Sequence, residues 1–206
     1  MPTTIDYYLA PQSPWTYLGH ERFTRIAAEA GATVRLLPVD LGGKVFPVSG
    51  GLPLAQRPPQ RQAYRLLELA RWRDFLGLPL NIKPKFFPVP ADDAARLIIA
   101  VDQADGTAAA MRLTGAVLTA VWAQERDIAN AATHAELLAE CGLAPQRADA
   151  AKAPEVQATY ERYTQQAIDA KVFGAPSYVV DGEIFWGQDR LDFLQRRLAA
   201  MNAARA

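Results

Sequence analysis

Ser13 stands where a helix is expected to begin, which makes its hydroxyl a candidate for chemistry. Serine at the N-cap and proline at the first helical position form a strong helix-start signal, and Pro14 follows Ser13 directly. The free amides and the dipole at a helix start favour an anion, and a hydroxyl donor beside them can stabilise a thiolate. The alternative is that Ser13 only caps the helix.

The surroundings of Ser13 favour a hydrogen-bonding role over a nucleophilic one. A serine hydroxyl is a weak nucleophile without an adjacent base, and no G-x-S-x-G motif surrounds this one. His20 lies about 10 Å further along the helix axis, too far for a direct bond. Thr16 completes a Ser-x-x-Thr spacing, and Cys141 is the single cysteine. Disulfide exchange is therefore excluded.

A second group of candidates flanks a predicted hairpin near the C-terminus. Strands are expected at residues 177–180 and 183–186, because the Asp-Gly pair between them is typical of a tight hairpin turn. Ala175 and Pro176 lead into the first strand. Residues 187–189, Gly-Gln-Asp, follow Trp186 and open an amphipathic final helix.

The two ends of the chain share one kind of pattern. Residues 5–9 and 33–39 read as strands, and the helix between them ends at Gly31, so the N-terminal segment forms a βαβ unit with parallel strands. The C-terminal segment adds the hairpin and a helix. Together they predict a small mixed sheet with helices, as in a thioredoxin fold.

The middle of the chain has a helical pattern. Residues 40–61 and 80–90 are rich in glycine and proline and are expected to be mostly loop. Helices are expected at residues 62–76, 92–105, 107–124, 134–140 and 154–170. The fold class is therefore α/β, a thioredoxin-like fold with a large all-helical insertion. The predicted domains are residues 1–43 and 150–206 for the thioredoxin-like part and 44–149 for the insertion.

Composition excludes several kinds of function. The 206 residues carry a formal net charge of zero, which argues against nucleic acid as the main partner. The two histidines, His20 and His134, lie far apart, so no metal site is expected. No apolar run is long enough to span a membrane, and residues 1–15 do not resemble a secretory signal. A cytoplasmic protein is the expectation.

Two segments resemble a known family. The first is Ser13-Pro14-Trp15-Thr16-Tyr17-Leu18-Gly19 after an Asp-Tyr-Tyr strand, and the second is the run from Phe173 to Leu191, which contains Gly-Ala-Pro-Ser and Trp-Gly-Gln-Asp. Together they look like 2-hydroxychromene-2-carboxylate isomerases, close relatives of kappa-class glutathione transferases in the DsbA-like branch of the thioredoxin superfamily. The likeness covers the whole chain in element order and is sharp in these two segments.

The resemblance implies a glutathione-dependent isomerase of aromatic hydrocarbon catabolism. Such enzymes interconvert 2-hydroxychromene-2-carboxylate and trans-o-hydroxybenzylidenepyruvate by thiolate addition, ring opening, bond rotation and thiolate elimination. Ser13 would be the catalytic residue, its hydroxyl lying against the glutathione sulfur. The resemblance also implies a cis Ala175–Pro176 bond, with the Ala175 backbone pairing with the cysteinyl amide of glutathione as an added strand does. The alternative is an ordinary trans proline that opens an edge strand.

The resemblance places the γ-glutamyl end of glutathione at Trp186, Gly187, Gln188 and Asp189. Helix-start amides suit its carboxylate, the Asp189 carboxylate suits its ammonium, and Gly187 permits close backbone approach. The alternative is that Gln188 or Asp189 only starts the helix and that Trp186 is core. Glutathione and a small aromatic carboxylate are thus the expected partners. The oligomeric state is open, a homodimer being one expectation.

Basic residues in the two proline-rich loops are candidates for the substrate carboxylate. They are Lys44, Arg57, Lys83 and Lys85. Lys44 is preferred because it directly follows the turn at the end of the second strand. Phe86 and Phe87 could wall an aromatic pocket, although aromatic pairs more often belong to a core.

Two other functions stay open. A kappa-like glutathione transferase would use the same thiolate but release a conjugate instead of free glutathione. A non-enzymatic thioredoxin-like binding module would not stabilise a thiolate at all. The sequence feature against that module is Ser13 together with residues 187–189.

Overall fold

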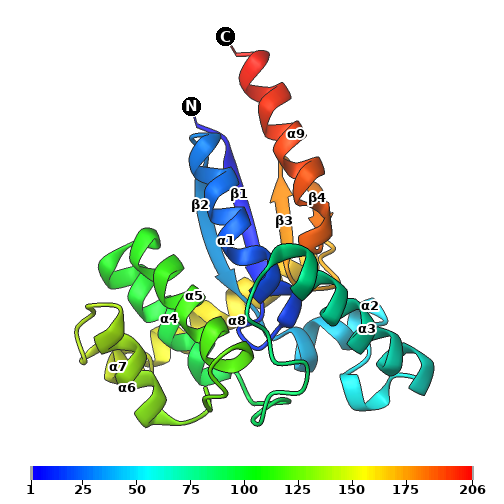
Figure 1. The fold of residues 1–206 in the computed structure, drawn as a ribbon. Helices are drawn as coiled ribbons and strands as arrows, with labels where there is room; N and C mark the ends of the chain where they lie inside the picture. The colour runs from blue at the N-terminus through cyan, green and yellow to red at the C-terminus, as the bar shows by residue number, and fades with distance from the viewer. Residues whose placement is uncertain (1, 206) are drawn as a thin grey trace.

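The computed structural model describes residues 2–205 and places one mixed sheet between layers of helices (Figure 1). The strand order is β2-β1-β3-β4; β1 and β2 pair in parallel, and the other two pairings are antiparallel. The strands are β1 (Thr4–Leu9), β2 (Thr33–Pro38), β3 (Ser177–Val180) and β4 (Glu183–Trp186). This is the thioredoxin-like sheet that the two ends of the sequence predict.

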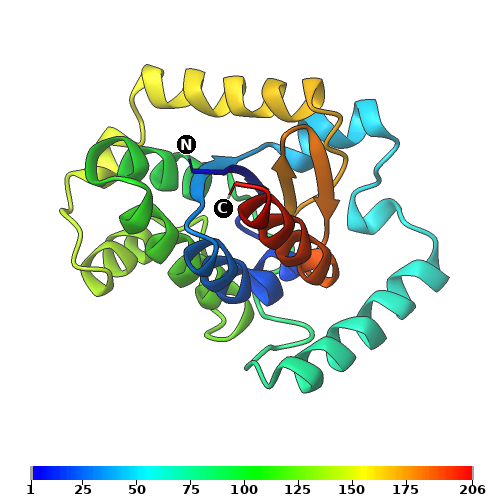
Figure 2. The same ribbon diagram turned by 90° about the horizontal axis from the view of Figure 1, so that it is seen from above.

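Helices cover both faces of the sheet and form the rest of the molecule (Figure 2). The α-helices are α1 (Pro14–Glu29), α2 (Phe46–Ser49), α3 (Pro59–Leu76), α4 (Asp92–Asp105), α5 (Thr107–Trp122), α6 (Ala131–Glu140), α7 (Arg147–Ala150), α8 (Pro154–Asp169) and α9 (Leu191–Ala203). A π-helical turn η1 (Leu41–Val45) and two 3-10 turns, η2 (Leu54–Gln56) and η3 (Gln188–Arg190), complete the elements.

The alternation of side chains along the strands separates two cores. Tyr7 of β1 belongs to the large core that α1 and α9 cover, whereas its neighbour Tyr8 belongs to a smaller core under α8. Figure 2 shows α1 and α9 on one side of the sheet and α8 on the other. The larger core continues without a break from Leu18 of α1 to Leu97 of α4. The helical insertion is therefore packed directly against the sheet domain.

Three expected boundaries are wrong in detail. Residues 40–61 are not mostly loop, because η1, α2 and η2 lie within them and α3 already begins at Pro59. Asp40 explains the first turn, since its Oδ1 accepts a hydrogen bond from the Gly43 amide at 2.7 Å. Helix α6 begins at Ala131 rather than 134, because the Asn130 side chain caps it.

The predicted Asp-Gly hairpin turn is confirmed. Asp181 and Gly182 have φ of 49° and 81°, the left-handed conformation that a type I′ turn needs at both positions. The turn joins β3 to β4, and β4 is the edge strand that leads into η3. Among residues 2–205, no helix is long and apolar enough to cross a membrane.

Candidate active site

Ser13 caps α1 and faces the segment that precedes β3. Its Oγ accepts a hydrogen bond from the Thr16 amide at 3.2 Å and donates one to the carbonyl oxygen of Ala175 at 3.3 Å. The side chain is buried, with 8% of the residue exposed. The bond to Ala175 joins residues 162 apart in sequence. The fold therefore brings the two sharpest parts of the sequence resemblance into direct contact.

The Ala175–Pro176 peptide bond is cis, as the resemblance implied. This geometry presents the backbone of Ala175 to Ser13. The Ala175 amide makes no hydrogen bond with any residue in the described range 2–205. A buried backbone donor is normally paired. An extended peptide lying beside Ala175 could accept that hydrogen bond.

Residues 187–189 are connected to the cis proline beside Ser13 through the backbone of Gly187. The Gly187 amide donates to the carbonyl oxygen of Pro176 at 2.8 Å, and Gly187 has a φ of 97°, which only glycine adopts without strain. Gln188 is 2% exposed, and its Oε1 is enclosed without a hydrogen-bond partner in the described chain. A Cβ added at Gly19 of α1 would lie 2.8 Å from the Gln188 Cβ, so α1 and η3 are in close contact.

Asp189 and Trp186 form the open end of this arrangement. The Asp189 carboxylate is 41% exposed and pairs with the Arg190 guanidinium at 2.6 Å. Trp186 is half exposed, so the interpretation of it as a core residue is wrong. Its indole packs edge-on against Phe173, with ring centroids 4.8 Å apart. Both side chains remain accessible to a ligand.

Lys44 lies in η1 and is exposed. Its ammonium makes no hydrogen bond or ion pair with the part of the chain that the structure describes. Arg57 is partly buried and donates to the Leu52 carbonyl at 2.8 Å. Lys83 and Lys85 are exposed. Within the described residues, no hydrogen bond joins any of these four side chains to Ser13.

A cluster of buried aromatic residues packs between α1 and the sheet. The Tyr7 ring lies 4.5 Å from Phe23 and 5.2 Å from Tyr178, measured between centroids. His20 is buried between the Tyr7 hydroxyl, 3.2 Å from Nδ1, and the Met111 carbonyl, 2.9 Å from Nε2. Burial lowers the pKa of His20 to about 4, so its imidazole is neutral at ordinary pH.

Sequence reasoning did not assign these supporting roles. The spacing along α1 separates His20 from Ser13, as expected, and gives no indication that Met111 of α5 receives the imidazole. The Tyr178 hydroxyl is enclosed with no hydrogen-bond partner among residues 2–205 and lies beside Gly19. From the sequence, the position of Tyr178 in a predicted strand indicates only that its side chain is buried.

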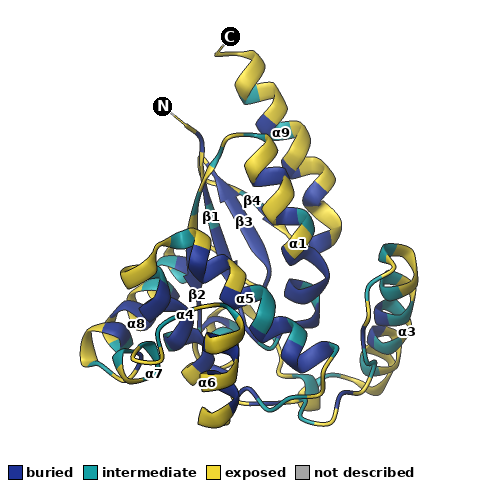
Figure 3. Ribbon diagram, turned by 60° about the vertical axis from the view of Figure 1, so that its left-hand side comes forward, coloured by how far each residue is buried: buried dark blue, intermediate teal, exposed yellow. Residues whose placement is uncertain are grey.

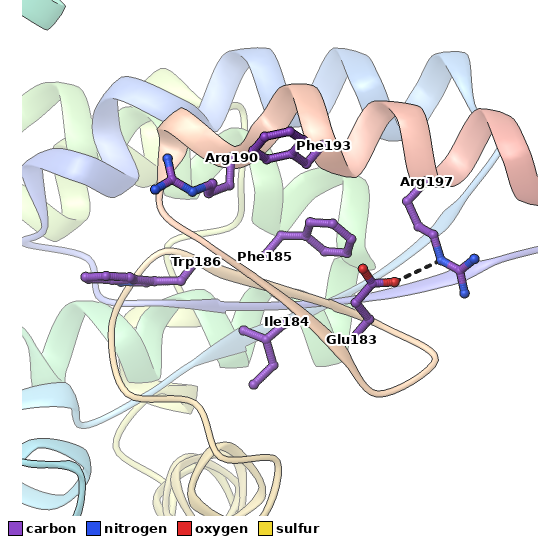
Figure 4. A pocket seen from close by; sticks show the side chains of 7 residues that line it. All are labelled: Glu183, Ile184, Phe185, Trp186, Arg190, Phe193 and Arg197. Carbon is purple, nitrogen blue, oxygen red and sulfur yellow. Dashed lines mark ion pairs between the residues drawn. The ribbon is translucent and has the colours of Figure 1, made fainter.

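Two cavities lie near these elements. One, of about 530 Å³, lies between β4 and α9 and is lined by Glu183, Ile184, Phe185, Trp186, Arg190, Phe193 and Arg197 (Figure 4). Its floor and rim carry three aromatic rings and two arginines, and Glu183 pairs with Arg197 at 3.0 Å. The other, of about 970 Å³, lies between α1 and α5, with Tyr17 and His20 on its α1 wall. In the described chain no group of three or more metal-ligating side chains is present.

These features define a DsbA-like protein, and comparison with known families agrees. The model of the DSBA-like thioredoxin domain family matches residues 4–199, so the chain belongs to that family. The confirmed fold class follows from this match and from the observed sheet.

Within that family the chain belongs with the 2-hydroxychromene-2-carboxylate isomerases. It is 30% identical to the enzyme of that name from Sphingobium xenophagum over 96% of this chain and 99% of the relative. A solved structure of a 2-hydroxychromene-2-carboxylate isomerase superposes with a TM-score of 0.76 at 24% identity, covering 98% and 99% of the two chains. Glutathione S-transferase kappa 1 from Caenorhabditis elegans is 24% identical over 92% of this chain and 88% of its own. The relative from Sphingobium xenophagum supports an enzyme of the isomerase kind.

Proposed function

We propose that this protein is a glutathione-dependent isomerase that interconverts 2-hydroxychromene-2-carboxylate and trans-o-hydroxybenzylidenepyruvate in the cytoplasm, as part of aromatic hydrocarbon breakdown. The observation that carries the proposal is the hydrogen bond from Ser13 to Ala175 beside the cis proline. It puts a hydroxyl donor, a helix start and a free backbone amide in one place. Cys141, at the end of α6, is the single cysteine, so the reacting thiol must come from a ligand.

The residues present fit the cysteinyl and γ-glutamyl parts of glutathione. The unpaired Ala175 amide suits the carbonyl of the cysteinyl residue, in the manner of an added strand. The Ala175 carbonyl can accept the cysteinyl amide once Ser13 turns away from it. That bond is long at 3.3 Å, so releasing it costs little. Ser13 can then donate to the sulfur.

The γ-glutamyl end fits the β4–η3 segment. The Asp189 carboxylate is accessible, so it can receive the γ-glutamyl ammonium, whereas the enclosed Gln188 Oε1 becomes available as an acceptor only if its side chain turns. Gly187 has no side chain to hinder the approach of the ligand, and its φ of 97° is one that other residues would adopt only with strain. Trp186 offers an exposed ring face for the rest of this group.

Bound glutathione would supply the thiolate that adds reversibly to the conjugated substrate. The role of Ser13 is to hold that sulfur in its charged form, because a hydrogen bond to a charged group contributes about 1.5–3 kcal/mol. Free thiols titrate near pH 8.5, and about 1.36 kcal/mol shifts a pKa by one unit. At the upper end of this range, one hydrogen bond from Ser13 is enough to make the thiolate the major form at neutral pH.

The two parts of the chain divide this work. Residues 1–43 and 150–206 would form the domain that binds glutathione, and the helical insertion at 44–149 would provide the substrate side, with Lys44 as one basic residue available to the carboxylate. One continuous hydrophobic core joins the two parts, which supports a rigid arrangement of the insertion on the sheet domain. Homodimer formation is compatible with this division but plays no part in it.

A kappa-like transferase is the second candidate, and the relative from C. elegans favours it. The test is to supply 2-hydroxychromene-2-carboxylate with a catalytic amount of glutathione and to follow the ultraviolet spectrum. An isomerase converts many equivalents and leaves the free thiol unchanged. A transferase stops when the thiol is consumed, and a binding module converts nothing. Absence of any glutathione requirement would also contradict the proposal.

A further inference from the structure

Arg65 is a buried cation without a counter-ion. It lies on α3, one turn before the fully buried Leu69, and only 9% of the residue is exposed. Its side chain makes no hydrogen bond or ion pair with residues 2–205, and its Nη2 is completely enclosed. Nη2 is the one guanidinium nitrogen of Arg65 that is fully enclosed without a partner in the described chain. Arginine is rarely buried unless it is paired.

Two aromatic rings hold the guanidinium in place. Its central carbon lies 5.1 Å from the ring centroid of Phe87 and 5.8 Å from that of Trp122. These two rings contact each other, with centroids 4.7 Å apart. Cation–π contacts of this kind offset part of the cost of burial but leave every N–H donor of the guanidinium unused. The packing therefore orients the cation and does not satisfy its hydrogen bonds.

The charge around Arg65 is positive. Burial and the neighbouring Arg57 cation lower its pKa to about 10, so it stays charged at neutral pH. No carboxylate within the described chain pairs with it. Arg57 in turn lies over the Phe46 ring at 6.0 Å. An anion would relieve this arrangement, because a buried charge without a partner is costly.

We propose that Arg65 forms the subsite for the carboxylate of a planar aromatic ligand, with Phe87 and Trp122 holding the guanidinium fork in place. The subsite rests on the proposed function, for which it names the residue that binds the substrate carboxylate. A rigid fork suits a carboxylate better than a hydrated point charge does. Lys44 is exposed, whereas Arg65 is buried and oriented, so we assign the substrate carboxylate to Arg65 rather than to Lys44.

The subsite is tested by equilibrium binding in the absence of glutathione, so that no chemistry is involved. The probes are trans-2-hydroxycinnamate and its primary amide, titrated by calorimetry into the full-length protein. We expect the wild-type protein to bind the acid at least tenfold more tightly than the amide. Arg65→Met should remove this preference, and Arg65→Lys should retain a small part of it. Arg71→Met is the matched control, because Arg71 is exposed on the same helix and pairs with Glu68.

Each outcome decides the inference. Equal binding of acid and amide by the wild-type protein would overturn it, and this comparison needs no variant that might unfold. Unchanged acid binding by a folded Arg65→Met protein would also overturn it and leave Arg65 as a packing residue. Acid binding that depends on Arg65 in a protein without isomerase activity would keep the subsite and reject the proposed reaction.

Discussion

The two ends of the proposed glutathione site differ in how much water reaches them. At the thiol end, Ser13 is buried, uncharged and bonded to the Ala175 carbonyl. At the γ-glutamyl end, Asp189 is exposed and already paired with Arg190. Figure 3 shows the same contrast at the level of elements, with the start of α1 largely buried and α9 largely exposed.

This difference assigns separate tasks to the two ends. Polar interactions are stronger where water is excluded, so the thiol end can change the charge state of a ligand. Exposed ion pairs contribute about 0–1 kcal/mol, so the other end can only adjust affinity. Changes at the buried end should therefore affect turnover and stability, and changes at the exposed end should affect binding.

The largest effect expected is a loss of folding stability in acid, which comes from His20, a buried residue of α1, the helix that Ser13 caps. The pKa of His20 falls from 6.5 to about 4 on folding, so between these values the unfolded chain binds the extra proton. The contribution of the neutral His20 imidazole to the free energy of unfolding is therefore fully present above pH 6.5 and is lost as the pH falls to about 4. At 1.36 kcal/mol per unit this amounts to about 3 kcal/mol. Urea unfolding of wild-type and His20→Gln proteins across pH 4–7 measures it, and an equal pH slope in both would contradict it.

Ser13→Ala is expected to lower turnover about 10- to 100-fold and to raise the pKa of bound glutathione. The reason is the loss of a hydrogen bond to a charged sulfur, worth about 1.5–3 kcal/mol. Thiolate absorbance against pH and the isomerisation rate at saturating glutathione measure the two effects.

The same substitution removes a helix cap, at a cost of about 1 kcal/mol in stability. Asn130→Ala is the matched control, because it removes a comparable side-chain cap from α6, away from the site. Ser13→Thr keeps both the cap and the hydroxyl. If Ser13→Ala and Asn130→Ala were equally active, Ser13 would be only a cap.

Gly187→Ala is expected to destabilise the fold by about 1–2 kcal/mol and to weaken glutathione binding. A φ of 97° strains any residue with a side chain, and the new Cβ would lie 2.5 Å from the Asp189 carboxylate. Gly182→Ala is the control, because Gly182 has a φ of 81° and open space around it. Thermal unfolding and calorimetry should show a similar stability loss in both and a binding loss only in Gly187→Ala.

Asp189→Ala should give the smallest effect, a two- to fivefold weaker binding of glutathione with unchanged turnover at saturation. The carboxylate is exposed, so its contribution falls in the range of surface ion pairs. Asp192 is an exposed residue of α9 that pairs with Arg22, and Asp192→Ala should leave the affinity for glutathione unchanged. A change in the thiol pKa of the Asp189→Ala complex would break the proposed separation between the two ends.

Much of the fold could be predicted because its signals are local. Short apolar strand segments, the Asp-Gly turn and the Ser-Pro helix start each act within a few residues, and the structure confirms them. Asn130 carries the same kind of signal, and its capping side chain starts α6 at Ala131, earlier than the expected residue 134. The cis Ala175–Pro176 bond was predicted only through the family resemblance, since local sequence leaves most X-Pro bonds trans.

The sequence by itself determined the element order, the helix start at Ser13 and the absence of a second cysteine for redox chemistry. Only the tertiary structure decided which polar groups share an environment. Ser13 meets Ala175 across 162 residues, and Arg65 of α3 meets Phe87 of the loop before α4 and Trp122 of α5. The physical reason is that burial and unpaired hydrogen-bonding capacity are properties of packed neighbours, and those neighbours are brought together by the sheet and the helices that cover it.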